Sequence, residues 1–273
     1  MPHDGPRVPV LSPSDAKRLV GATFVAEVEY HDVIGSTNDR AKELAQRGGA
    51  CLPVLVIAQR QTAGRGRGEN RWWTGVGSLA LSVLVDLKSF GVAGMHTPLV
   101  ALAAGIAVVG AVRTCVPGVP LGLHWPNDVY LAGKKLAGIL VESAAGGLHV
   151  VGIGVNVNNT AGDAPQELRG QLTTLRDETG RFHNPAPIVH RLLQGLETWL
   201  ARLGKTPHRV ARRADGLCLQ RGRLVCLQHP EGATQGLCLG IAADGALVLE
   251  TQGGQHAYYT GSVSLASSET SGA

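Results

Sequence analysis

The segment HWPNDVYLAGKKLAGILVE, residues 124–142, contains a short apolar run, a turn and a longer apolar run in succession. The first run, VYL at 129–131, and the second, KLAGILVES at 135–143, are rich in the apolar and β-branched residues that favour strands. Between them lies Ala-Gly-Lys at 132–134, where glycine allows the backbone conformations that tight turns need. The segment therefore predicts two strands joined by a tight turn.

Polar residues stand at both ends of this strand pair. Pro126 forces an extended or turn geometry on its neighbour, Asn127 and Asp128 follow at a strand end, and Lys135 then enters an apolar strand. A lysine ammonium at the start of a buried strand is costly unless it meets an anion. A simpler interpretation stays open at this point, in which Asn-Asp makes a turn and Lys134 and Lys135 form a hairpin tip.

Periodicity along the rest of the chain predicts both helices and strands. Helices are expected from Thr37 or Asn38 to Gly48, from 98 to 114 after a Thr97 cap, and from 187 to 203. Strands are expected at 52–58, 78–87, 121–125 and 148–157. Past Arg213 the chain changes to short β-like runs, with a hairpin signal at Asp244-Gly245. We therefore predict a tail at 1–20, a main domain at 21–210 and a small all-β domain at 214–270.

Composition and charge exclude several classes of protein. The 273 residues are 44% apolar, enough to fill the core of a globular protein, and the net charge is only +4. That charge is too low for a surface that follows a nucleic-acid backbone throughout, so any basic function must be local. The five cysteines contain no C-x-x-C pair, which argues against a disulfide framework or zinc site and favours a reducing cytoplasm. We expect no export signal and no membrane span.

A glycine- and arginine-rich loop is predicted at QTAGRGRGENRWW, residues 61–73. Its alternating glycines would let the backbone approach a ligand, while Arg65 and Arg67 supply permanently charged donors for carboxylate or phosphate oxygens. It is not a P-loop, because no G-K-[ST] ends it. Three interpretations stay open on composition alone: a solvated basic loop, a nucleic-acid contact, and a site for a small anion.

Two further segments combine small or polar residues with the ends of regular structure. GIGVNVNN, 152–159, has glycines inside a strand, which often mark close approach of a ligand, and Asn156 and Asn158 would face the same side. GSTNDRA, 35–41, offers hydroxyl and amide groups at a helix N-terminus, suited to the polar edge of a ligand. A polar outer face and simple helix capping are the structural alternatives for these segments.

The order of these motifs resembles that of the biotin protein ligases. The resemblance rests on S-T-N at 36–38, Q-x-x-G-R-G-R at 61–67, W-P-N-D with K-L-A-G-I-L-V-E at 125–142, and G-I-G-V-N-V-N at 152–158. It implies an α+β fold, in which a mixed-sheet, class II synthetase-like catalytic domain of the biotin and lipoate ligases precedes a small SH3-like β-barrel. The segment before Ser36 does not resemble the winged-helix repressor domain of bifunctional members, so a monofunctional type is expected.

The resemblance also implies an activity. Members join biotin to ATP, giving biotinyl-5′-AMP and pyrophosphate, and then pass the biotinyl group to a lysine of a biotin carboxyl carrier domain, such as that of acetyl-CoA carboxylase. It implies ATP and biotin as substrates, Mg²⁺, no DNA and no membrane, with a homodimer left open. Two rivals remain: a lipoate or octanoate ligase or transferase of the same fold, and a nucleic-acid-binding module that uses Trp72 and Trp73 as stacking platforms.

Site residues follow from the matched motifs. The resemblance assigns catalysis to Lys135, Arg65 and Arg67. It assigns biotin binding to Ser36, Thr37, Asn38, Gln61, Gly64, Arg65, Gly66, Arg67, Lys135, Gly138 and Gly152. It assigns ATP or adenylate binding to Arg67, Trp72, Asn127, Asp128, Lys135 and Asn156, with Asp128 also next to magnesium.

Two positions depart from the family's pattern. Glu69 and Asn70 stand where the glycine-rich loop commonly has Gly and Arg, and Arg71 would supply part of that missing charge. His124 stands where lysine usually precedes W-P-N-D. Because histidine titrates near neutrality, ATP binding is expected to weaken above about pH 7 if His124 helps to hold phosphate.

Overall fold

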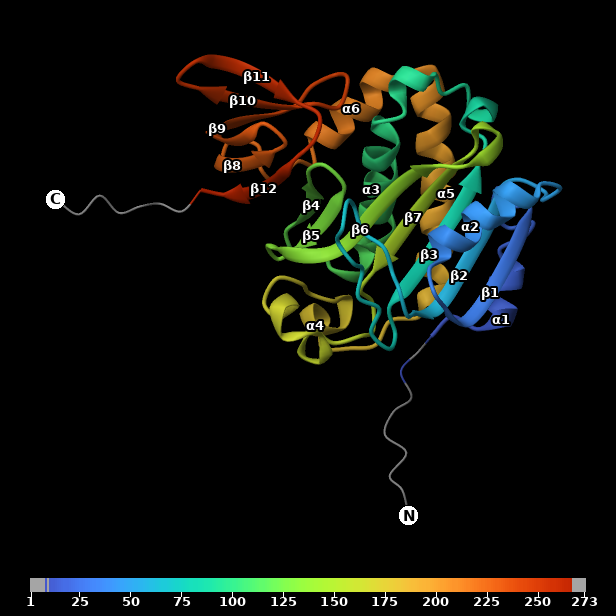
Figure 1. The fold of residues 1–273 in the computed structure, drawn as a ribbon. Helices are drawn as coiled ribbons and strands as arrows, with labels where there is room; N and C mark the ends of the chain where they lie inside the picture. Colours follow the sequence, from blue (N-terminus) through green and yellow to red (C-terminus); the bar gives the residue numbers. More distant parts are fainter. Residues whose placement is uncertain (1–7, 9, 267–273) are drawn as a thin grey trace.

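The computed structural model describes residue 8 and residues 10–266. Within them the larger sheet has seven strands in the spatial order β1-β2-β3-β7-β6-β5-β4 (Figure 1). Their bounds are β1 Glu27–Ile34, β2 Val54–Gln61, β3 Leu79–Val85, β4 Leu121–His124, β5 Asp128–Leu131, β6 Lys134–Ser143 and β7 His149–Val155. Strands β1 and β2 are parallel, and every other neighbouring pair is antiparallel, so the sheet is mixed.

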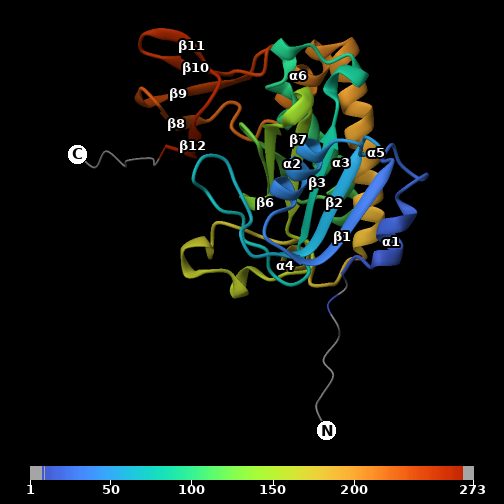
Figure 2. The same cartoon turned by 45° about the vertical axis from the view of Figure 1, so that its right-hand side comes forward.

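Helices cover both faces of this sheet, α2 on one side and α3 with α5 on the other (Figures 1 and 2). The helix bounds are α1 Pro13–Arg18, α2 Thr37–Arg47, α3 Leu99–Val112, α4 Leu175–Thr179, α5 Pro185–Lys205 and α6 Pro207–Asp215. All of β3 is buried, because helices lie above and below it. Helix α3 is apolar nearly all round and is likewise buried, as expected of a helix between a sheet and a second helix. In the described residues, no helix combines the length and apolarity that crossing a membrane requires.

The second sheet is small, antiparallel and C-terminal, in the order β11-β10-β9-β8-β12. Its strands are β8 Leu224–His229, β9 Gly232–Ile241, β10 Leu247–Thr251, β11 Gly254–Tyr258 and β12 Ser262–Leu265. It is joined to the larger sheet through the indole of Trp125, whose Nε1 donates to the Gly245 carbonyl oxygen at 3.0 Å. The hairpin predicted at Asp244-Gly245 is the connection between β9 and β10. This sheet is therefore fixed next to the W-P-N-D segment.

The predicted α+β class is confirmed, and the differences lie at the chain's N-terminal part and at element ends. Residues 13–18, which we assigned to the tail, form α1, and Ala16 is buried in the core. Ser36, rather than Thr37 or Asn38, caps α2, because its hydroxyl accepts from the Asp39 backbone N–H. Helix α3 begins after Pro98 with no side-chain cap from Thr97. Strand β1 and helix α6 were not expected from the sequence.

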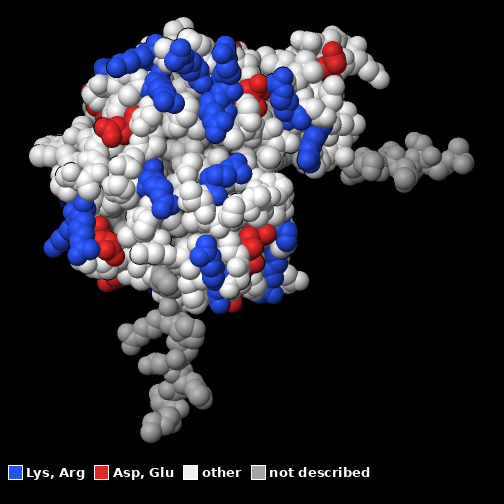
Figure 3. Space-filling view, turned by 180° about the vertical axis from the view of Figure 1, so that it is seen from behind, with Lys and Arg blue, Asp and Glu red and all other residues white. Residues whose placement is uncertain are grey.

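Exposed positive charge gathers on one part of the surface. Seen from behind, Lys and Arg side chains lie close together near the end of α5 and along α6, and are more widely spaced elsewhere (Figure 3). The exposed Lys and Arg residues at the C-terminal end of α5 and in α6 are Arg202, Lys205, Arg209, Arg212 and Arg213. The basic surface is thus local, as the small net charge requires.

Candidate functional site

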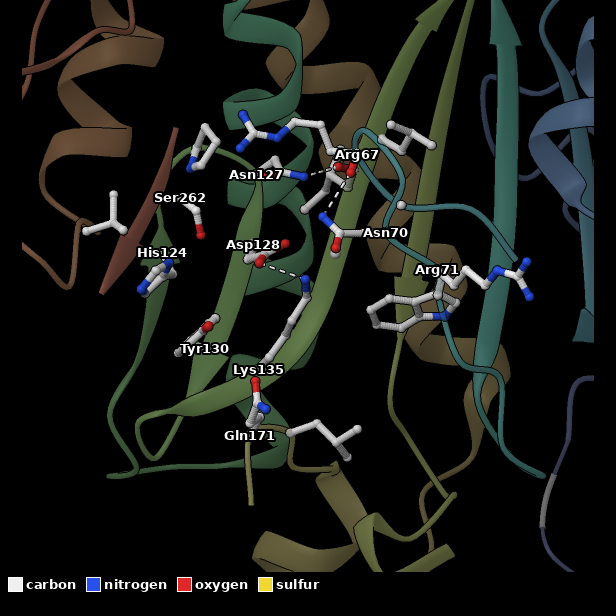
Figure 4. A pocket seen from close by; sticks show the side chains of 18 of the residues that line it. Arg67, Asn70, Arg71, His124, Asn127, Asp128, Tyr130, Lys135, Gln171 and Ser262 are labelled. Atoms are coloured by element: carbon white, nitrogen blue, oxygen red, sulfur yellow. Dashed lines mark hydrogen bonds and ion pairs between the residues drawn. The ribbon is translucent and has the colours of Figure 1, made fainter. Parts of the chain in front are cut away.

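A cavity of about 360 Å³ opens between β5, β6, the 62–78 loop and β12. Figure 4 shows side chains from these elements converging on it. The predicted site residues that line it are Gly66, Arg67, Trp72, Asn127, Asp128, Lys135, Gly138 and Asn156. The predicted site residues outside its lining are Ser36, Thr37, Asn38, Gln61, Gly64, Arg65 and Gly152. The chain therefore brings one group of these residues together around an open space and packs the other group elsewhere.

Lys135 and Asp128 face each other in the cavity (Figure 4). Lys135 Nζ lies 2.7 Å from Asp128 Oδ2, with the two side chains 35% and 18% exposed. The pairing of β5 with β6 shifts register after Val129, and Tyr130 is paired with Lys135 on the far side of this bulge. Bulges commonly re-aim a side chain next to a site. Lys135 is therefore more than a residue of a hairpin tip, since its ammonium is half-buried and paired with Asp128.

The glycine-rich loop closes on itself by backbone pairing. Trp72 N donates to the Gly64 carbonyl at 3.0 Å, and Gly66 N donates to the Asn70 carbonyl at 2.8 Å. A Cβ at Gly64 would collide with the Trp72 carbonyl oxygen, so glycine is required there by the loop itself. Asn70 Nδ2 donates to the Arg67 carbonyl at 2.9 Å and closes the tip. The departure from the common Gly-Arg pattern thus supplies a side chain that orders this loop.

The loop's arginines have different surroundings. Arg67 donates through Nη2 to the Gly261 carbonyl and through Nη1 to Thr260 Oγ1 at 3.3 Å, so the loop tip contacts the segment that leads into β12. Arg65 instead donates to Asp39 Oδ1 at 2.5 Å and Glu142 Oε1 at 2.6 Å. The hydrogen bond that Arg65 donates to Asp39 raises the pKa of Arg65 further above its usual value. Arg67 therefore reaches the cavity, whereas Arg65 is engaged outside it.

The indole of Trp72 covers a pair of glycines on the sheet. Gly138 of β6 and Gly154 of β7 are directly paired, and a Cβ on either would press against the Trp72 ring. Lys135 Nζ lies 5.9 Å from the centroid of that ring. Trp72 Nε1 is buried without a hydrogen-bond partner among the described residues. Glycine in these strands thus creates a flat apolar floor, and of the two tryptophans it is Trp72 that packs on it.

The N-terminal end of α2 belongs to a buried polar network. Thr37 N and Thr37 Oγ1 donate to Gln61 Oε1 at 2.8 and 3.1 Å. Ser82 Oγ lies 2.7 Å from Thr37 Oγ1 and 2.6 Å from Asn38 Oδ1. A Cβ at Gly152 would collide with Asn38 Oδ1, so that glycine is needed for the packing of α2 on β7. These groups form a continuous hydrogen-bonded polar wall next to the cavity-lining residues, made of Thr37, Asn38, Gln61 and Ser82.

Two aromatic rings form one side of the cavity. His124 of β4 and Tyr130 of β5, which are diagonal neighbours in this strand pair, stack with ring centroids 4.2 Å apart and planes 15° apart. Burial lowers the pKa of His124, and the opposing charge of Asp128 does not restore it. Burial, with a smaller effect of the same carboxylate, raises the pKa of Tyr130 to about 12. His124 is therefore neutral at pH 7, and any pH effect through it falls on the acid side of neutrality.

The asparagines of the predicted site divide into cavity and structural positions. Asn127 Nδ2 donates to the Ile139 carbonyl at 2.6 Å and ties β5 to β6. Asn156 lines the cavity and its Oδ1 accepts from Asn159 Nδ2 at 3.0 Å. Asn158 instead exchanges hydrogen bonds with the His183 backbone. The predicted common face of Asn156 and Asn158 is wrong, because β7 ends at Val155 and the alternation does not continue.

Oxygen ligands for a cation are sparse in the described part of the chain. No group of three or more His, Cys, Asp or Glu residues able to hold a metal occurs there. Asp128 Oδ1, however, is buried and has no hydrogen-bond partner among the described residues. A single carboxylate oxygen fits a Mg²⁺ ion held mainly by substrate phosphates and water, and does not fit a resident metal site.

Several residues around the site were not predicted from sequence. Tyr130, Gln171 and Ser262 line the cavity, Ser82 belongs to the polar wall, and Glu142 accepts a hydrogen bond from that wall. A serine in the middle of an apolar strand is a signal that could have pointed to Ser82, because a buried hydroxyl requires a partner. No local signal points to Ser262, since it reaches the cavity only through the arrangement of the two sheets.

Comparisons with known proteins agree with this geometry. Residues 30–158 match the Biotin/lipoate A/B protein ligase family, and residues 222–266 match the Biotin protein ligase C terminal domain. The chain is 33% identical over 255 residues to the Biotin--[acetyl-CoA-carboxylase] ligase of Mycobacterium tuberculosis, covering 92% of this chain and 94% of that protein. It is 34% identical over 246 residues to the Bifunctional ligase/repressor BirA of Bacillus spizizenii, covering 86% of this chain and 73% of the relative.

Solved structures show the same arrangement. The biotin protein ligase from Aquifex aeolicus in complex with biotin and ATP superposes with a TM-score of 0.77 at 28% identity, covering 88% of this chain and 99% of that chain. The biotin protein ligase from Leishmania major in complex with biotinyl-5-AMP, at 22% identity and a TM-score of 0.59, shares the fold.

Proposed function

This chain belongs to the biotin protein ligase family, and from that premise we propose that it activates biotin with ATP and transfers the biotinyl group to a lysine of a carrier domain. The observation that carries the proposal is the Lys135 ammonium beside the Trp72 indole, at 5.9 Å from the ring centroid. Gly138 and Gly154 leave room for this indole to pack on the sheet, and the indole lines the cavity, where it offers an apolar surface to a ring system. A half-buried cation next to such a surface suits a ligand with an apolar body and an anionic end.

In the first half-reaction, the biotin carboxylate oxygen attacks the α-phosphorus of ATP and pyrophosphate leaves. We propose that Lys135 stabilises the negative charge that develops on the α-phosphate, because a preorganised cation in a partly desolvated site stabilises such charge strongly. Arg67, at the tip of the loop, is assigned to the phosphates, since its guanidinium presents planar paired donors. No nucleophile of the enzyme is needed, so positioning and electrostatics carry the step.

Nucleotide binding is proposed along the β4–β5 side of the cavity. His124 and Tyr130 offer a stacked aromatic wall, and Asn156 offers an amide group. The unpaired Asp128 oxygen is assigned to a Mg²⁺ ion that arrives with ATP, where the ion neutralises phosphate charge. Asp128 itself holds Lys135 in its orientation through the 2.7 Å ion pair.

The second half-reaction requires a carrier domain at the mouth of the cavity. We propose as acceptor the biotin carboxyl carrier domain of acetyl-CoA carboxylase or a related biotin-dependent enzyme, in line with the names of two relatives. The lysine amine attacks the carbonyl carbon of biotinyl-5′-AMP, and AMP leaves. The five cysteines are all free, which supports a reducing compartment such as the cytoplasm.

The proposal is tested by measuring pyrophosphate release from ATP in the presence of biotin, octanoate or lipoate. We expect release that depends on biotin, together with biotinyl-5′-AMP retained by the protein. Release with octanoate or lipoate and none with biotin would favour the lipoate branch of the same fold. The W-P-N-D and K-L-A-G-I-L-V-E motifs and the matched C-terminal domain favour biotin.

A further inference from the structure

Glu142, near the end of β6, lies where three hydrogen-bond donors from other segments meet. Its side chain is only 15% exposed. Oε2 accepts from Asn38 Nδ2 at 2.8 Å, and Oε1 accepts from Lys42 Nζ and from an Arg65 guanidinium nitrogen, each at 2.6 Å. The proposed function gives this carboxylate no role, although it connects the first turns of α2 to the start of the glycine-rich loop.

The negative charge of the Glu142 carboxylate is balanced by the hydrogen-bond donors and positive charges around it. Burial by itself would raise the pKa of Glu142, but the hydrogen bonds from Asn38 and Lys42 and the charges of Lys42 and Arg65 outweigh it and lower that pKa. The side chain is therefore ionised at neutral pH. An ionised acceptor makes shorter and stronger hydrogen bonds than a neutral one, so it fixes the donors around it.

Asn38 connects Glu142 to the rest of the polar wall through hydrogen bonds. Its other end, Oδ1, lies 2.6 Å from Ser82 Oγ, which lies 2.7 Å from Thr37 Oγ1. Thr37 in turn donates to Gln61, whose strand leads directly into the glycine-rich loop. The chain of contacts from Glu142 to Gln61 thus joins residues that the resemblance to the biotin protein ligases assigns to biotin.

Arg65 connects Glu142 to the glycine-rich loop itself. Its second carboxylate partner, Asp39, is 47% exposed, whereas Glu142 is 15% exposed. Solvent screens the exposed pair more strongly, so the Glu142 contact is the firmer of the two. Because the backbone of Arg65 forms a bridge with that of Arg71 across the loop, fixing Arg65 also fixes the returning loop segment that carries Trp72.

We propose that Glu142 is a positioning residue for biotin binding, which sets the polar wall through Asn38 and the closed form of the glycine-rich loop through Arg65. This inference rests on the proposed function, because it concerns the same ligand. It assigns Glu142 an effect on ligand affinity and none on the chemical step.

The test is steady-state kinetics of biotin-dependent pyrophosphate release for Glu142→Gln, which keeps the side-chain length and removes the charge. We expect the KM for biotin to rise roughly tenfold or more, with kcat at saturating biotin and ATP changed by less than about threefold. In an Arg65→Ala background, the same substitution should raise KM by a smaller factor than in the wild type, because the Arg65 contact is already gone and only the Asn38 contact remains to be lost.

Glu43→Gln is the matched control, since it removes an exposed carboxylate of α2 that pairs only with Arg40 among the described residues. It should keep wild-type constants. The inference would be overturned by a wild-type KM for Glu142→Gln or by a decrease in kcat with no change in KM. It would also be overturned if the effects of Glu142→Gln and Arg65→Ala on KM were additive. If Glu142→Gln does not fold, Glu142→Asp retracts the carboxylate while keeping its charge, and a wild-type KM for that variant would overturn it equally. Absence of biotin-dependent release in the wild type would instead refute the proposed function.

Discussion

Replacing Lys135 with Met separates catalysis from stability at one residue. Lys135 Nζ and Asp128 Oδ2 are 2.7 Å apart. At an effective dielectric constant of about 20, their attraction is roughly 6 kcal/mol before the cost of desolvation is subtracted. Because the side chains are 35% and 18% exposed, solvent offsets most of that attraction. We expect Lys135→Met to lower the free energy of unfolding by only about 1–2 kcal/mol.

The effect on adenylate formation should be much larger. A preorganised group that stabilises charge in the transition state contributes about 2.7–4 kcal/mol, which corresponds to roughly 100–1,000-fold in kcat. The assay is single-turnover formation of biotinyl-5′-AMP with saturating biotin and ATP, followed by thermal unfolding of the same protein. A decrease in Tm of about 2–8 °C is expected for a chain of this size.

Lys134→Met is the control, because Lys134 is the adjacent lysine of β6 and its side chain is exposed. It should keep wild-type rates. The reasoning is refuted if Lys135→Met slows adenylate formation by less than about threefold relative to Lys134→Met. It is also refuted if the loss of rate follows the loss of folded protein as temperature rises.

Three further substitutions test other parts of the site. Arg67→Gly removes the contact with Gly261, and biotinyl-5′-AMP should escape into solution faster during turnover; unchanged leakage, measured by filtration, would exclude a closing loop. In the wild type, the KM for ATP should fall below about pH 6.5, since burial keeps the His124 imidazole neutral at higher pH. His124→Lys should abolish this fall, and identical pH profiles for the two proteins would exclude a role of His124 in holding phosphate. Gly154→Ala inserts a Cβ against the Trp72 ring, so it should raise the KM for biotin about tenfold and shift tryptophan emission, whereas Gly110→Ala, whose Cβ meets open space, should do neither.

Elements with a clear local pattern were predictable, and those stabilised by distant partners were not. The apolar alternation of Leu79–Val85 predicts a strand by itself. Strand β1, EVEYHDVI, mixes charged and apolar residues because it is an edge strand, and it is recognisable only once β2 pairs with it. Helix α6 is short and arginine-rich, and its apolar residues Val210, Ala211 and Ala214 form a face only against the helices below.

The site residues divide in the same way, into those that local sequence predicts and those whose surroundings depend on distant partners. Motifs that stand close in sequence, such as Asp128 with Lys135, could be assigned to one site because a single turn brings them together. The surroundings of Arg65 could not, since its partners Asp39 and Glu142 lie 26 and 77 residues away in sequence. An arginine in a glycine-rich loop predicts an anion, but only the three-dimensional structure shows that Arg65 lies against two carboxylates of the protein.

Transfer of the biotinyl group is the step that distinguishes this enzyme from others of the same fold. Purified protein is incubated with ATP, Mg²⁺, labelled biotin and a biotin carboxyl carrier domain, and the carrier is then analysed by mass spectrometry. We expect one biotinyl group on a single carrier lysine, and none on a carrier in which that lysine is replaced by arginine. Transfer of octanoate or lipoate, with no transfer of biotin under the same conditions, would contradict the assignment.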